Sequence, residues 1–150
     1  MGLFDKVFGK EAVQQSTTLS KQEAFLAIAL ATSAADGHIA QSEIDSMFAY
    51  LMNMRMFEQS TSQQMGRMFD KLMGILKRGG PSALITAAKD PLPDDMRETA
   101  FACAVDIALA DGVLEEDEKD LLSELQSALE VPENIAVTII QVMIIKNRGN

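Results

Sequence analysis

The chain has 150 residues, 47% of them apolar, and its 13 basic and 22 acidic side chains give a net charge of −9 with the histidine neutral. This length suits a single domain, and the apolar content argues against an intrinsically disordered chain. A single cysteine, Cys103, excludes an internal disulfide, and no signal peptide is recognisable, so we expect a cytoplasmic protein. The acidic balance argues against nucleic acid as a partner and favours cations or basic proteins.

Apolar residues recur at helical spacing through most of the chain, and no run alternates as a strand does, so the sequence predicts an all-α fold of about seven helices. In chain order the expected helices cover residues 21–35, 40–54, 60–79, a short segment from 81, 94–110, 115–129 and 132–146. We expect one helical domain over residues 21–150, preceded by an amphipathic N-terminal segment, residues 1–20.

Glycine, proline and capping residues set several of these boundaries. Ser60 followed by Gln63 is a capping-box pattern, which predicts the start of the third helix. Gly79 and Gly80 predict its end, and Pro81 suits the first position of a short fourth helix.

Residues 135–145 form the most apolar segment and are rich in β-branched side chains, which favour strands. A lone strand would have no pairing partner, so we predict a buried helix at the centre of the core. If part of it is exposed, an apolar patch of that size suggests a homodimer through this C-terminal helix. The segment is well short of the roughly 20 residues that span a bilayer.

The motif Asp-Gly-x-[Ile/Leu]-x-x-x-Glu occurs twice, beginning at Asp36 and at Asp111, each time after an alanine-rich helix. Flanking positions match in the same register. The sequence therefore predicts two three-helix repeats, about residues 21–78 and 94–146, joined by the short fourth helix and packed about a pseudo-twofold axis.

These two motifs concentrate carboxylates at two bends. Asp36 and Asp111 lie at the negative end of a helix dipole, which is unfavourable by about 0.3–1 kcal/mol, whereas Glu43 and Glu118 lie in a first turn, where acid is favoured. One explanation is structural: the carboxylates accept N–H groups of the following helix. The other is functional, because clustered oxygens suit a hard divalent cation such as Ca²⁺, Mg²⁺ or Mn²⁺.

The spacing also matches the second half of an EF-hand loop, with Gly37 at the position of the invariant glycine. Positions 1 and 3 then fall on Thr32 and Ala34, which supply no carboxylate, so we do not expect a working EF-hand. His38 could add a nitrogen ligand and favour Zn²⁺, but its counterpart in the second motif is Val113.

The doubled motif in a helical chain resembles the tellurite-resistance protein B (TerB-like) family over about residues 21–146. The resemblance implies a seven-helix fold of two similar halves, an acidic face that binds divalent metal, and a bacterial role in tellurite or chemical stress near the inner membrane, beside other stress-response proteins. The metal ligands that it implies are Asp36, Glu43, Asp111 and Glu118. The chain departs from the pattern at Ala40 and Glu115, where an N-cap Ser, Thr or Asp would be expected.

Catalytic signatures are absent from the sequence: it has no Gly-x-Ser-x-Gly, no His-Glu-x-x-His and no P-loop. We therefore expect a non-enzymatic protein that binds a divalent cation through its two Asp-Gly corners. The alternative is a metal-free protein–protein interaction module with structural carboxylates, which docks a basic partner on its acidic C-terminal half. A carboxylate–metal hydrolase is a third interpretation.

Overall fold

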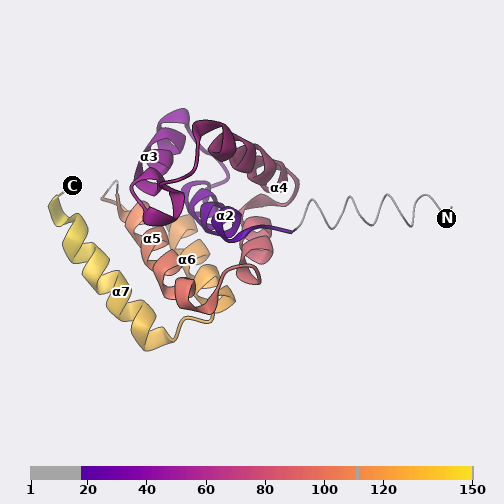
Figure 1. Ribbon diagram of the computed structural model, residues 1–150. Coiled ribbons are helices and arrows are strands. Elements are labelled where there is room, and N and C mark those ends of the chain that lie inside the picture. The colour runs from indigo at the N-terminus through magenta and orange to yellow at the C-terminus, as the bar shows by residue number, and fades with distance from the viewer. Residues whose placement is uncertain (1–17, 111, 150) are drawn as a thin grey trace.

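The computed structural model describes residues 18–110 and 112–149, which are helical and contain no strand; this confirms the all-α prediction (Figure 1). The α-helices are α2 (Lys21–Ser33), α3 (Gln41–Met52), α4 (Ser62–Lys89), α5 (Arg97–Leu109), α6 (Glu116–Ala128) and α7 (Glu133–Lys146). Short 3-10 turns are η2 (Arg55–Phe57), η3 (Asp94–Met96) and η4 (Asn147–Gly149). The N-terminal segment predicted for residues 1–20 falls largely on residues 1–17, which lie outside the described part of the chain.

Helix α2 lies at the centre of the molecule, and α3, α4, α5 and α6 pack against it (Figure 1). Its alanines Ala24, Ala27 and Ala31 are fully buried, and such small side chains let neighbouring helices approach closely. Phe25 is buried as well and meets the ring of Phe57 in η2 edge-on, with ring centroids 6.4 Å apart. The alanine-rich segment is therefore the core of the domain.

Helix α4 contains the break that the glycine pair predicts. Gly80 has φ 76° and ψ −175°, a conformation that side-chain-bearing residues rarely adopt, and Pro81 follows it at the start of the second arm. The third and fourth expected helices are thus two arms of one element. The seven expected segments correspond to the six α-helices of the described residues.

The start of α4 lies one residue later than the capping pattern predicts. The N-cap is Thr61, whose Oγ1 accepts the Gln64 N–H at 3.1 Å while Gln64 Oε1 accepts the Thr61 N–H at 2.9 Å. Ser60 with Gln63 offers the same chemistry, but the Ser60 hydroxyl lies 3.5 Å from the Gln22 amide nitrogen and accepts a hydrogen bond from it. The tertiary contact with α2 selects between the two registers.

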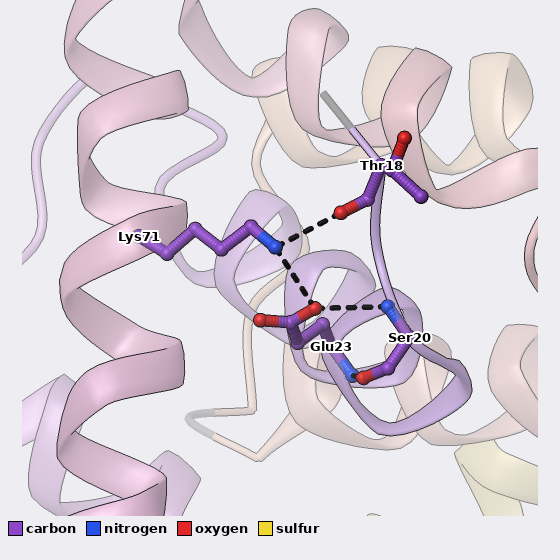
Figure 2. Close-up of polar contacts among 4 residues, drawn as sticks. All are labelled: Thr18, Ser20, Glu23 and Lys71. Carbon is purple, nitrogen blue, oxygen red and sulfur yellow. Dashed lines mark hydrogen bonds and ion pairs between the residues drawn. The ribbon is translucent and has the colours of Figure 1, made fainter. Parts of the chain in front are cut away.

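A polar cluster joins the start of α2 to α4 (Figure 2). Lys71 Nζ donates to Glu23 Oε1 at 3.1 Å and to the Thr18 carbonyl at 2.9 Å. Glu23 Oε1 also accepts the Ser20 N–H at 2.8 Å, and Ser20 Oγ accepts the Glu23 N–H, which completes a capping box. One carboxylate thus caps its own helix and binds the neighbouring one.

Helix α7 is not at the centre of the core, and the prediction of a buried helix is wrong. It runs along the edge of the molecule and packs on α5 (Figure 1). Ala136 is its buried residue, whereas Val137, Ile144 and Ile145 are 47%, 44% and 59% exposed. The centre is occupied instead by α2, because its alanines permit closer packing on all sides than β-branched residues do.

The order α2, α3, first arm of α4 is followed by α5, α6 and α7, and α4 packs on α2 as α7 packs on α5. This order agrees with the sequence repeat, and the pseudo-twofold relation between the halves stays a prediction. None of the described helices combines the length and apolarity that crossing a membrane requires.

Candidate functional site

The first Asp-Gly corner joins α2 to α3. Gly37 has φ 90°, the left-handed conformation expected after a helix end, and its N–H donates to the Ala34 carbonyl at 2.9 Å. Asp36 Oδ1 accepts the His38 N–H at 3.0 Å, and Glu43 Oε1 reaches back to accept the Ala40 N–H at 3.1 Å. Each carboxylate therefore satisfies a backbone donor of its own corner.

The second corner, between α5 and α6, repeats this arrangement where it is described. Gly112 has φ 84° and donates its N–H to the Leu109 carbonyl at 2.9 Å. Glu118 Oε1 accepts the Glu115 N–H at 3.0 Å, as Glu43 does in the first corner. Asp111, the fourth predicted ligand, lies outside the described residues.

The side chains of Ala40 and Glu115 do not cap their helices, and these contacts explain how the two helix starts are stabilised without such a cap. Glu43 and Glu118 stand at the third position of their helices, where an acidic side chain can reach back to the backbone N–H of the cap residue. This is half of a capping box, and it also places negative charge at the positive end of the helix dipole. The structural explanation of these two carboxylates thus has direct support.

The two corners nevertheless face one cavity, of about 720 Å³. It is lined from the first corner by Asp36 and Glu43 and from the second by Glu118. The other acidic side chains that line it are Asp106, Glu115 and Asp117, and the basic side chain that lines it is Lys146. A concave surface with such an excess of one sign of charge raises the local concentration of cations.

The described side chains do not form a preassembled metal centre. No three His, Cys, Asp or Glu side chains in this part of the chain come close enough together to hold one ion. His38 is exposed and is not among the residues that line the cavity, so a nitrogen ligand for Zn²⁺ has no support. A cation here would have to be held by few carboxylates, with water as the remaining ligand.

A buried polar cluster in the wall of the cavity has no counterpart in the sequence predictions. The Asp106 side chain is 6% exposed and accepts hydrogen bonds from Tyr50 Oη at 2.9 Å, Lys146 Nζ at 3.2 Å and Asn147 Nδ2 at 2.8 Å. One carboxylate thus joins α3, α5 and the end of α7. The sequence does contain one signal that could have indicated this cluster: Asp106 is a lone charged residue within the apolar, alanine-rich segment of α5.

The acid–base properties of this cluster follow from burial and hydrogen bonding. Burial alone would raise the pKa of Asp106, but hydrogen bonds from Asn147, Tyr50 and Lys146 outweigh it, so the pKa lies below its ordinary value of 3.8. Burial, with Cys103 and Asp106 nearby, raises the pKa of Tyr50. Burial likewise raises the pKa of the Cys103 thiol, which makes thiolate formation unfavourable at neutral pH.

Comparison with known proteins bears on this arrangement. The family model described as "Tellurite resistance protein TerB" matches residues 22–139, from the start of α2 into α7. The chain belongs to this family. Both Asp-Gly corners fall inside the matched region, which confirms the resemblance seen in the doubled motif. No curated protein and no solved structure matches the chain.

Proposed function

We propose that this member of the tellurite resistance family is a non-enzymatic protein that binds a hydrated divalent cation in its acidic cavity. The observation that supports the proposal is the common cavity itself, because Asp36 and Glu43 of one corner and Glu118 of the other line the same space. Together with the family's name, this favours a role in tellurite or chemical stress, beside other stress-response proteins.

The hydrogen bonds to the backbone are compatible with a ligand role. A carboxylate offers about four acceptor positions on two oxygens, and one N–H occupies one of them. Asp36 Oδ1 and Glu43 Oε1 make these contacts, and neither residue makes a further hydrogen bond or ion pair within the described residues. The backbone contacts hold both side chains in a defined orientation.

The sparse ligand set favours particular ions. Mg²⁺ keeps several waters and is commonly held by one or two carboxylates, whereas Ca²⁺ takes about 6–8 oxygen ligands and structural Zn²⁺ is usually held by Cys and His. Oxygen ligands also suit Mn²⁺. We therefore expect Mg²⁺ or Mn²⁺ to bind in preference to Ca²⁺ and Zn²⁺.

The test is thermal unfolding with each of the four ions. A bound ion at 100 times its dissociation constant stabilises the fold by about 2.7 kcal/mol. The double variant Glu43→Gln, Glu118→Gln should keep the fold without ions, because a glutamine side chain also accepts the N–H of the cap residue, and it should lose only the helix-dipole contribution of about 0.3–1 kcal/mol per site. Its response to ions should be lost. Glu98→Gln is the matched control, since Glu98 is an exposed first-turn acid of α5 away from the cavity.

Two results would overturn the proposal: no ion changes the melting temperature, or the double variant responds as the parent does. The first would favour the metal-free interaction module, which the backbone contacts of Glu43 and Glu118 also support. In that case Glu43→Ala and Glu118→Ala should each destabilise the fold by about 0.5–2 kcal/mol through loss of a cap, and ions should change nothing.

A further inference from the structure

Large exposed apolar side chains gather on α7. Val137, Val142, Ile144 and Ile145 are between 44% and 59% exposed, while the other exposed large apolar residues of the described chain lie singly on α3 and in the connection between α5 and α6. Ala136 is buried on the side of α7 that packs on α5. Among the described residues, most of the exposed large apolar side chains thus belong to α7, which lies along the edge of the molecule (Figure 1).

One exposed side of α7, its outer face, has a symmetrical sequence pattern. Of the exposed apolar residues, Val137 and Ile144 lie on this face, whereas Val142 and Ile145 lie on other sides of the helix. Glu133, Val137, Gln141, Ile144 and Arg148 follow one another at intervals of four or three residues, which places them along one side of a helix, and all five are exposed. Arg148 lies just beyond α7, in η4. Glu133 and Arg148 make no ion pair within the described residues.

We propose that this face binds the same face of a second copy, with the two α7 helices antiparallel across a twofold axis. An axis between residues 140 and 141 brings Glu133 of each copy opposite Arg148 of the other. It likewise brings Val137 opposite Ile144 of the other copy. Gln141 then lies beside its own counterpart, and a primary amide both donates and accepts hydrogen bonds.

The chemistry of the face favours a second copy over a different partner. Its acid and its base stand at opposite ends of an apolar centre, so it is complementary to itself in the antiparallel sense and in no parallel arrangement. Antiparallel helices also place opposite ends of their dipoles together. A basic partner would be drawn instead to the strongly acidic surfaces of a chain with a net charge of −9. The dimer is independent of cation binding in the cavity.

The test is sedimentation equilibrium over a range of concentrations, with charge-reversal variants. Glu133→Arg and Arg148→Glu each place like charges opposite one another, and each should raise the dimer dissociation constant by about tenfold or more. An equimolar mixture of these two variants should form heterodimers about as stable as the parent dimer, because both end pairs are then of opposite charge. Controls of the same charge change are Glu98→Arg, in the first turn of α5, and Arg55→Glu, in η2; both positions are exposed and neither should affect association.

The mixing experiment separates this dimer from other assemblies, because neither altered folding nor a different interface predicts restored association on mixing. Melting curves of the single variants check that the fold is retained. The variant Val137→Gln, Ile144→Gln should also dissociate, since it removes the apolar centre. A parent protein that is monomeric at every concentration would overturn the proposal, as would a mixture of the charge variants that stays monomeric.

Discussion

Replacing Asp106 with alanine is the sharpest test of what holds the C-terminal helix in place. The side chain is 6% exposed and accepts hydrogen bonds from α3, through Tyr50, and from the end of α7, through Lys146 and Asn147. Alanine removes the carboxylate, so the Tyr50, Lys146 and Asn147 donors lose this acceptor. Because the donors come from different helices, the loss should loosen the contacts of α3 and α7 with α5.

The magnitude follows from the individual contacts. Lys146 is 58% exposed and can return to water, so its contribution is small. The Tyr50 and Asn147 bonds are made to a charged group in a buried setting, at about 1.5–3 kcal/mol each. Asn147 keeps a second bond, to the Met143 carbonyl at 2.8 Å. The two bonds together contribute about 3–6 kcal/mol. Because Asn147 keeps its second bond, we expect Asp106→Ala to lower the free energy of unfolding by an amount in the lower part of this range, about 3–4 kcal/mol.

The assay is urea unfolding at neutral pH, followed by circular dichroism. Asp106→Asn keeps an acceptor oxygen and loses the charge, so it should cost less, about 1–2 kcal/mol. Asp95→Ala, at an exposed acid in η3, is the control and should stay within about 0.5 kcal/mol of the parent.

The pH dependence supplies a second readout. Because the folded-state pKa of Asp106 is lowered, its contribution is present above the unfolded-state pKa and is lost as the pH falls through the folded-state value. The difference in stability between the parent and Asp106→Asn should therefore shrink as the pH falls below about 4. A loss below about 1 kcal/mol for Asp106→Ala, or a difference from Asp106→Asn that does not change with acid, would refute this reasoning.

Three further substitutions test the kink in α4 and the polar contact between α2 and α4. Gly80→Ala should destabilise the protein by about 1–3 kcal/mol, because φ is 76° there, whereas Gly66→Ala in the first arm of the same helix should stabilise it by about 0.5–1 kcal/mol. Equal effects in urea unfolding would show that the kink is not set by the backbone. Lys71→Met removes the donor to Glu23 and to the Thr18 carbonyl, and should cost about 0.5–1.5 kcal/mol, a partly exposed pair being worth less than a buried one. A variant as stable as the parent would show that this cluster contributes nothing.

The backbone pattern was the part of the structure most open to prediction from sequence. Gly80 followed by Pro81 marks the break in α4, and Gly37 and Gly112 mark the left-handed turns of the two corners, because these residues restrict or widen the local φ and ψ choices by themselves. The doubled motif was also sufficient for the family, which the match over residues 22–139 confirms.

The role of the carboxylates was less open to prediction. Spacing alone could not decide whether Glu43 and Glu118 cap their helices or face a common space, and the structure shows them doing both. The first is a contact within three residues, which a capping pattern can suggest. The second depends on how the two halves pack, and no local pattern carries that information.

Amino-acid order by itself determined, to within a residue or two, where helices begin, bend and end, since caps, glycines and prolines act on the backbone within a turn or so. At the start of α4 the contact of Ser60 with Gln22 selected between two adjacent capping registers. Only the tertiary structure decided which helix became the centre and which stayed at the edge. Residues 135–145 are the more apolar segment, yet α2 is buried, because small alanine side chains admit neighbours on every side. The hydrogen bonds of Asp106 were also decided by the tertiary structure. Tyr50 and Asn147 are far from Asp106 in sequence and reach it only through the packing of α3, α5 and α7.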